Sequence, residues 1–257
     1  MEYILNEKKY AEHILQEGYV TNKNLLYSVN VLAKYYKTLG YERREARKAL
    51  KDWLAKNNTR LPDSAAAAWI KRALETAERQ SLCDIDYIEI TQPELDRIRA
   101  IHSSRFKDIS VQKLAFSLLC LAKFGYHKGI KSYWVNAPYK YFFGIANLAI
   151  PIEKQNLFVN ELYKDGYIDL NPKIENHNIK VLGIFEGETA VTVANLNEAG
   201  LVYEEICGKK FSKCTRCNKM IAITNGRNLY CKSCAKENNR EKTRERIKKI
   251  RTEMQNV

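Results

Sequence analysis

Two Cys-x-x-Cys pairs near the end of the chain constrain its folding more than any other feature of the sequence. They are Cys214 with Cys217 and Cys231 with Cys234, and 13 residues separate the two pairs. Each such turn can direct both of its sulfurs toward one centre, so two turns complete the tetrahedral ligand set of structural zinc. The spacing therefore predicts one structural Zn2+ ion within residues 213–235, with no position left open for a catalytic water.

The segments around the cysteines predict a local fold. Residues 220–224 and 228–230 flank Asn225-Gly226, which is a strong signal for a β-hairpin turn. The second cysteine pair then leads into a long helical segment at about 232–252. A knuckle, a hairpin and two last ligands in the first turn of a helix resemble the treble-clef class of zinc fingers.

Positive charge is concentrated in the same region. Of the net charge of +13, +9 falls on residues 201–257, where 15 lysines and arginines face 6 glutamates. Such an excess favours a polyanion partner, because neutralising phosphates releases counterions. Pairs such as Glu241 with Arg244 leave open a self-supporting solvated helix instead. The residues expected to contact phosphates are Lys236, Arg240, Lys242, Arg244, Arg246, Lys248, Lys249 and Arg251.

Residues 1–83 predict a helical domain. Apolar residues recur at helical spacing in the segments 5–17, 25–39 and 42–57, and glycines follow the first two of these. Asp63 is expected to cap a fourth helix. These apolar stripes are expected to pack into a core, and the basic segment 42–48 is expected to be a solvated face.

The boundary between the first and second domains is expected at residues 84–91. Residues 84–90 are acidic and alternating, which suits a short strand or an extended linker. Thr91 and Glu94 have the spacing of a capping box and predict a helix from there to about residue 102. The second domain is expected to span residues 91–185.

The order of elements in residues 110–185 predicts a winged helix. A long apolar helix comes first, followed by a strand at 133–135 and two short helices at about 138–148 and 151–164. A β-hairpin with strands at 167–170 and 179–185 completes the order. A winged helix commonly places its third helix in the major groove of DNA and its hairpin against the backbone.

Three amides on the expected third helix are candidates for reading base edges, namely Gln155, Asn156 and Asn160. The same helix carries no net positive charge, so the phosphates would be held by lysines on the preceding elements. Those lysines are Lys113, Lys123, Lys128, Lys131 and Lys140. A winged helix that binds protein would have much the same sequence pattern.

The expected fold class is therefore mainly α (α+β). A helical N-terminal domain precedes a winged-helix middle. An acidic linker at 186–208, containing a short helix, leads to the zinc-binding module and basic helix at 209–257. The N-terminal segment lacks the apolar region of a signal peptide, and no stretch is apolar enough for a membrane span. We expect a cytoplasmic protein without a membrane partner.

No arrangement of residues typical of catalysis is visible. The four histidines lie far from the cysteine pairs, so a nuclease of the His-metal treble-clef type would lack its ligands and its base. His177 falls in the expected wing, where a solvated loop residue is the simpler interpretation. Gly125 and Gly129 do not have the spacing of a phosphate-binding loop. We expect a protein that is not an enzyme.

Three segments carry a resemblance to a known type of protein. They are Leu32 to Tyr41, Leu114 to Phe124, and the tail from Cys214 to Arg251. Together they resemble a type of uncharacterised protein from phages and mobile elements of low-GC Gram-positive bacteria. The first segment also resembles the small helical domain appended to some primases and replication proteins. The resemblance implies a role in phage replication, regulation or host takeover, in the host cytoplasm.

Two functions from different classes follow. The first is a non-catalytic, zinc-containing accessory or regulatory protein that binds nucleic acid, with DNA favoured over RNA. The second is a phage-encoded interaction protein that modulates a host machine, such as RNA polymerase or a nucleic-acid-guided defence complex. The basic tail favours the first function, and the neutral third helix favours the second.

Overall fold

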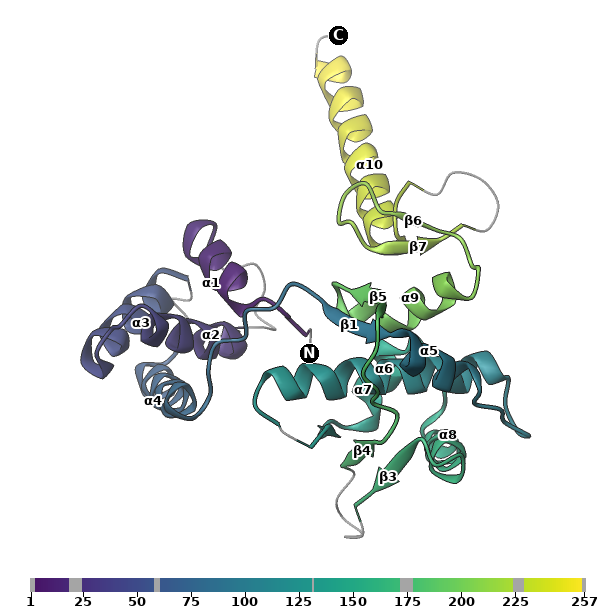
Figure 1. Ribbon diagram of the computed structural model, residues 1–257. Coiled ribbons are helices and arrows are strands. Elements are labelled where there is room, and N and C mark those ends of the chain that lie inside the picture. Colours follow the sequence, from purple (N-terminus) through teal and green to yellow (C-terminus); the bar gives the residue numbers. More distant parts are fainter. Residues whose placement is uncertain are drawn as a thin grey trace. The chain divides into compact units, whose positions relative to one another are not determined.

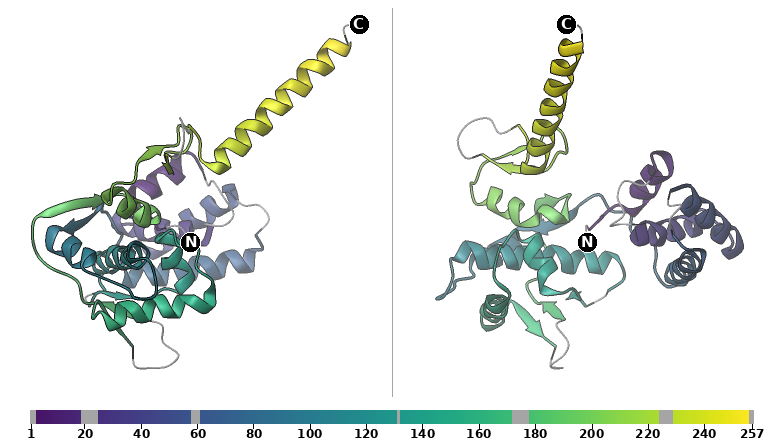
Figure 2. Two further views of the ribbon diagram at one scale, coloured as in Figure 1. Left: turned by 90° about the vertical axis from the view of Figure 1, so that its right-hand side faces the viewer. Right: turned by 180° about the vertical axis from the view of Figure 1, so that it is seen from behind.

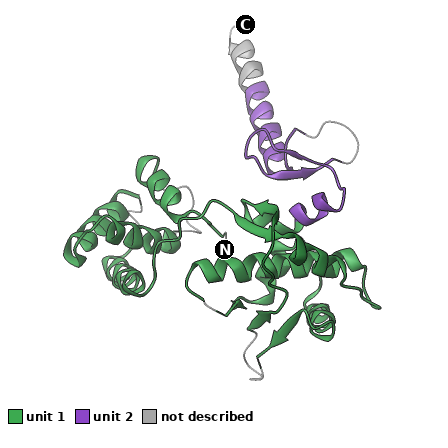
Figure 3. Cartoon of the chain, viewed as in Figure 1, with its two compact units in different colours: residues 1–200 green, residues 201–257 purple. Residues whose placement is uncertain are grey.

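The computed structural model describes residues 3–18, 25–57, 61–130, 132–171, 178–223 and 229–255, with side chains up to residue 247 in the last range. The chain divides into two compact units, residues 1–200 and 201–257 (Figure 3). It is mainly helical with small sheets, which confirms the expected fold class at this level. Among the described residues, no helix is both long and apolar enough to cross a membrane.

Unit 1 begins with four helices, as predicted. They are α1 (Glu7–Gln16), α2 (Leu25–Thr38), α3 (Arg43–Asn57) and α4 (Asp63–Arg79) (Figure 1). Their apolar faces meet in one core that includes Leu32, Leu50 and Ile70. Asp63 is the first residue of α4, and Pro62 occupies the capping position without a side-chain hydrogen bond. The prediction that Asp63 caps this helix was therefore wrong by one position.

A buried carboxylate ties the first helices to the centre of unit 1. Glu7 is fully buried and forms ion pairs with Lys34 on α2 and, at 3.0 Å, with Lys128. Its second oxygen also accepts a hydrogen bond of 2.9 Å from the backbone N–H of Cys83. A buried charge needs such partners because burial removes its water. The predicted 1–83 and 91–185 segments thus lie in the same compact unit.

The acidic segment 84–90, predicted to be a short strand or an extended linker, leads into a strand. β1 (Ile88–Thr91) pairs antiparallel with β5 (Thr189–Val193), so that Ile88 lies opposite Val193. A short 3-10 helix, η2 (Leu196–Glu198), and α9 (Ala199–Ile206) follow. The short helix expected in the linker at 186–208 is present, and the strand β5 in the same segment was not predicted.

The centre of unit 1 is the buried helix α6 (Asp108–His127), and α5 (Gln92–Arg99) precedes it. Glu94 accepts the predicted capping hydrogen bond from the N–H of Thr91 at 2.8 Å. Around α6 lie β2 (Trp134–Val135), α7 (Tyr139–Ile145), α8 (Ile152–Lys164), β3 (Ile168–Leu170) and β4 (Ile179–Val181), in the predicted order (Figure 1). The three strands form an antiparallel sheet in the order β2-β4-β3. Of the loop expected at 171–178, residues 172–177 lie outside the described residues.

Unit 2 consists of a small hairpin and a long helix after α9. The hairpin pairs β6 (Phe211–Lys213) with β7 (Met220–Ala222). β7 lies within the predicted strand 220–224, and its pairing with β6 was not predicted. Asn225-Gly226 lies outside the described residues. The helix α10 (Lys232–Gln255) extends away from the hairpin of its own unit as a single rod (Figure 2).

Candidate metal centre and basic helix

The first cysteine pair lies in the tight turn that joins β6 to β7. The N–H of Cys214 donates to the carbonyl of Lys219 at 2.9 Å, and the N–H of Asn218 donates to the carbonyl of Cys214 at 2.8 Å. Asn218 has a φ of +56°, in the left-handed region that asparagine tolerates better than most residues. The local sequence thus closes a knuckle around Cys214 and Cys217.

The second pair lies where α10 begins. Cys231 immediately precedes the helix, and Cys234 lies in its first turn. The N–H of Ala235 donates to the carbonyl of Cys231 at 2.8 Å, so the helical pattern starts at this ligand. The N–H of Cys231 also points to the sulfur of Cys214 at 3.3 Å. The hairpin and the helix therefore bring the two pairs together.

The four sulfur atoms have the spacing of a metal ligand set. All four lie within 4.8 Å of one another, and none forms a disulfide. The sulfurs of Cys217 and Cys231 are 3.7 Å apart. A tetrahedron with metal–sulfur bonds of about 2.3 Å has edges of about 3.8 Å. Cys214, Cys217, Cys231 and Cys234 can therefore hold one metal ion, and the exposed Cys207 is not part of the group.

The protonation of the thiols shows why a cation suits this site. The Ser233 hydroxyl, 3.1 Å from the sulfur of Cys231, lowers the pKa of that thiol to about 6. The hydrogen bond with Cys231 in turn raises the pKa of Cys234 to about 12. Neighbouring thiols resist simultaneous ionisation because their negative charges repel. A metal ion removes that repulsion and needs the ionised form of each ligand.

An ion pair joins the knuckle to α10. Arg216 stands between the first two ligands and donates two hydrogen bonds to Glu241, with Nη1–Oε2 and Nη2–Oε1 distances of 3.2 and 2.8 Å. This contact lowers the pKa of Glu241. The sequence predicts a pair between Glu241 and Arg244 on the same helix and not the contact with Arg216, since no local spacing links residues 25 positions apart.

The cations of α10 are presented to solvent. Lys236, Arg240, Lys242, Arg244 and Arg246 are exposed, and no ion pair among the described residues involves any of them. The helix has 24 residues, which corresponds to a length of about 36 Å. Lys248, Lys249 and Arg251 belong to this helix, but their side chains lie outside the described residues. Three of the described cations follow one another at four-residue intervals, at positions 236, 240 and 244.

The three amides predicted to read bases have different positions on α8. Asn156 and Asn160 are exposed. Gln155 is only 8% exposed, and its side-chain nitrogen donates to the carbonyl of Ile150 at 3.0 Å. Its place on the inner face of α8 removes Gln155 from the candidate set. The helix period of 3.6 residues turns position 155 inward while 156 and 160 face outward.

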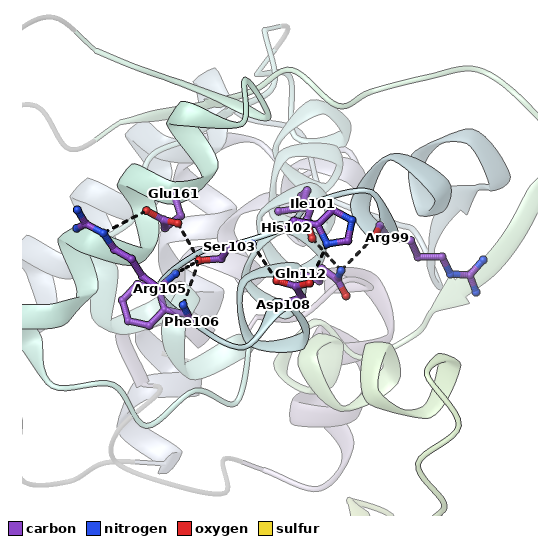
Figure 4. A network of polar contacts seen from close by, with 9 residues as sticks. All are labelled: Arg99, Ile101, His102, Ser103, Arg105, Phe106, Asp108, Gln112 and Glu161. Carbon is purple, nitrogen blue, oxygen red and sulfur yellow. Dashed lines mark hydrogen bonds and ion pairs between the residues drawn. The ribbon is translucent and has the colours of Figure 1, made fainter.

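Two acidic groups near α8 are also engaged internally. Glu161 is 9% exposed and accepts a hydrogen bond of 2.7 Å from the hydroxyl of Ser103 (Figure 4). Arg105 lies 3.9 Å from the same carboxylate, and Asp165 pairs with Arg97. The exposed charges of α8 are Glu153, Lys154 and Lys164, a net charge of +1. The solvent-facing side of the helix is thus less acidic than its sequence indicates.

Figure 4 shows that the loop before α6 is held at both of its ends. The carboxylate of Asp108 accepts a hydrogen bond of 2.8 Å from the N–H of Ser103 and lies 2.8 Å from His102 Nδ1. Both interactions lower the pKa of Asp108, with the His102 contact the larger cause. The Ser103 hydroxyl bonds to Glu161 rather than to His102, so the serine and histidine serve to position the loop.

The lysines expected to anchor phosphates are mostly used inside unit 1. Lys113 is 4% exposed and donates to the carbonyl of Asn147 at 3.3 Å. Lys123 pairs with Glu94 at 2.6 Å, and Lys128 pairs with Glu7. These three lysines stabilise buried carboxylates and carbonyls, so their assignment to phosphate binding was wrong. Lys140 is exposed, and Lys131 lies outside the described residues.

No protein-family model, curated protein sequence or solved structure matches this chain.

Proposed function

We propose that this protein binds nucleic acid without catalysing a reaction, through the cations of α10, and that a structural zinc ion fixes the start of that helix. The observation that carries the proposal is the row of exposed cations, with no ion-pair partner among the described residues, on a helix that starts at the cysteine cluster. Phosphate contacts of this kind give affinity that is independent of sequence.

Zinc is the metal that suits the cluster best. Four thiolates at tetrahedral spacing are a soft ligand set, which selects zinc or iron–sulfur chemistry over magnesium or calcium. With four sulfurs from the protein, a single ion has no open position, so its contribution is to folding rather than to catalysis. The order of hairpin, knuckle and helix supports a treble-clef arrangement.

The middle of unit 1 supports a winged-helix contribution to DNA binding. The strand order β2-β4-β3, with α8 as the third of the helices α6, α7 and α8, supports this proposal. Asn156 and Asn160 are the amides available to read base edges in the major groove. DNA is therefore favoured over RNA as the partner, with α10 supplying the general affinity.

A second candidate function rests on the apolar residues of the same helix. Ile152 is 78% exposed, Tyr163 is 50% exposed and Leu157 is 36% exposed on α8. Exposed apolar and aromatic side chains are enriched at protein interfaces. The alternative is thus a phage-encoded protein that binds a host machine, such as RNA polymerase or a nucleic-acid-guided defence complex, through α8.

One purification experiment tests the proposal against the alternative. The full chain is purified with and without nuclease treatment, and the absorbance ratio at 260 and 280 nm and the co-eluting proteins are recorded. Nuclease-sensitive absorbance at 260 nm, together with anisotropy binding to purified duplex DNA, is the expected result. A stoichiometric host protein that survives nuclease, with no affinity for purified DNA or RNA, would contradict it.

A further inference from the structure

A cavity of about 550 Å3 in unit 1 is lined by three tyrosines together with charged and polar side chains. It lies against the last turn of α6, the segment before β1, and the residue preceding β2. Tyr87, Tyr126 and Tyr133 contribute three rings to its wall. It uses none of the residues of α8 or α10. Tyr87 and Tyr126 are 48% and 49% exposed, so large parts of both side chains are accessible to a ligand.

Two of these rings are already arranged as a stack. The ring centroids of Tyr126 and Tyr133 are 4.9 Å apart, and their planes differ by 16°. Tyr133 has a φ of +54°, which is an outlier for a bulky side chain. Its carbonyl accepts a hydrogen bond of 3.2 Å from the N–H of Val181, which holds this backbone conformation. Backbone strain that the fold maintains in this way clusters at ligand sites.

Two of the three charged side chains that line the cavity, Asp86 and Lys123, form ion pairs. The ammonium group of Lys123 is 2.6 Å from Glu94 and 2.8 Å from the carbonyl of Glu89. Asp86 pairs with Lys9 at 2.7 Å. The Glu89 carboxylate and the His127 imidazole also line the wall. The site therefore offers ring surfaces, a few polar groups and one carboxylate that can accept hydrogen bonds.

This combination suits a neutral heterocycle that has donors and acceptors on its edge. Proteins bind unpaired bases by stacking them on aromatic side chains, since every base has a flat π face. We propose that this cavity binds an unpaired nucleobase of a single-stranded nucleic acid, stacked against Tyr126. The inference rests on the proposed nucleic-acid function and adds a single-strand preference that α10 alone would not give.

The test compares two oligonucleotides of equal charge. The full chain is titrated into labelled oligothymidylate of about 15 nucleotides and into an abasic strand of the same length. Anisotropy is recorded at one salt concentration. The phosphates are the same in both strands, so any difference reports the bases. The expected result is a preference of about fivefold to a hundredfold for oligothymidylate.

Variants then locate the preference. Tyr126→Ala should remove the preference for oligothymidylate over the abasic strand, and Tyr126→Phe should keep it because the ring remains. Tyr41→Ala, which removes a 43% exposed tyrosine between α2 and α3, should leave this preference unchanged. Each variant's melting temperature shows whether it is folded. If Tyr126→Ala fails to fold, the matching substitution Tyr87→Ala takes its place.

Three outcomes would overturn the inference. Equal binding of both strands by the wild-type chain, with duplex DNA still bound, would leave the proposed function standing and refute the cavity's role. If Tyr126→Ala and Tyr87→Ala both keep the preference for oligothymidylate, the base binds elsewhere. If neither oligonucleotide binds at the cavity, but tetramethylammonium does and Tyr126→Ala abolishes that binding, the site is an aromatic cage for cations. Failure to bind any nucleic acid would refute both proposals.

Discussion

Arg216, in the turn between the first two cysteine ligands, donates two hydrogen bonds to Glu241, two turns along α10. The bidentate geometry gives this contact a defined direction. It joins the knuckle to the helix at a second point beyond the cysteine cluster. The direction of α10 relative to the hairpin of unit 2 thus has two determinants, the sulfur cluster and this ion pair.

Arg216→Ala should loosen the helix without removing the metal. Amide hydrogen exchange in residues 235–241 should accelerate because the second anchor is lost. The zinc content should stay the same, since the substitution removes no ligand. Arg244→Ala, which removes a cation of α10 that has no partner among the described residues, is the matched control. Equal exchange in both variants would show that Arg216 does not restrain α10.

Metal content and folding of unit 2 should be coupled. Elemental analysis should give one zinc per chain, because one group of four cysteines can hold one ion. Cys231→Ser should abolish zinc binding and unfold residues 213–235, while the helices of unit 1 keep their protection from hydrogen exchange. Cys207→Ser is the control, since Cys207 is exposed and outside the cluster. Two zinc ions per chain, or none in freshly purified protein, would refute the site.

Glu7→Gln should destabilise unit 1 at neutral pH by about 3–5 kcal/mol, because it leaves Lys34 buried without its counterion. Burial by itself raises the pKa of Glu7, but Lys128, Lys34 and the N–H of Cys83 lower it on balance. A lowered pKa stabilises the fold above the unfolded-state value of about 4.3. That stability is lost as the pH falls through the folded-state pKa.

Denaturant unfolding from pH 7 to pH 3 checks this prediction. The wild-type chain should lose stability on acidification more steeply than Glu7→Gln, so that the difference between them narrows. Glu12→Gln, at a partly exposed position of α1, should behave like the wild type. A constant difference across this pH range would mean that the Glu7 carboxylate does not titrate as described.

Local signals in the sequence predicted local structure well. The cysteine pairs, the helices before Gly18 and Gly40, and the Glu94 hydrogen bond to Thr91 all depend on residues a few positions apart. The pairing of β1 with β5 could not be predicted, because β5 is short, largely exposed and about a hundred residues away.

The candidate site likewise contains features that depend on local spacing and features that depend on long-range contacts. The metal ligands could be predicted from spacing alone. The roles of Lys128 and Gln155 could not be predicted. The sequence around a lysine does not distinguish one that binds phosphate from one that pairs with a buried carboxylate. Lys128 pairs with Glu7, which is 121 positions away in the sequence, and Gln155 points inward because of the way α8 packs. Such contacts are properties of the folded chain.

Asn156→Ala and Asn160→Ala should erase any preference for a DNA sequence and leave general affinity in place. Each bidentate contact to a base is worth about 1–3 kcal/mol of discrimination, whereas the phosphate contacts of α10 are the same for all sequences. Selection from random duplexes with zinc-loaded protein supplies the preferred site for the comparison. Gln155→Ala should alter stability rather than sequence preference, because Gln155 is buried. A selection that enriches no motif would favour protein binding by α8.

The most direct test of the central claim is the salt dependence of duplex DNA binding by a triple variant of α10. Lys236→Ala, Arg240→Ala and Arg244→Ala remove three exposed cations that follow one another at four-residue intervals. Each lost phosphate contact should reduce the slope of log K against log salt by about 0.9, so the slope should fall by about 2 to 3.

The matched control removes the same charge from unit 1 through Lys8→Ala, Lys51→Ala and Lys71→Ala, all at exposed positions. If α10 carries the nucleic-acid contacts, anisotropy titrations should show a weaker, flatter salt response for the α10 variant and a nearly unchanged slope for the control. An α10 variant that binds with wild-type affinity and slope would contradict the account and identify α10 as a solvated helix.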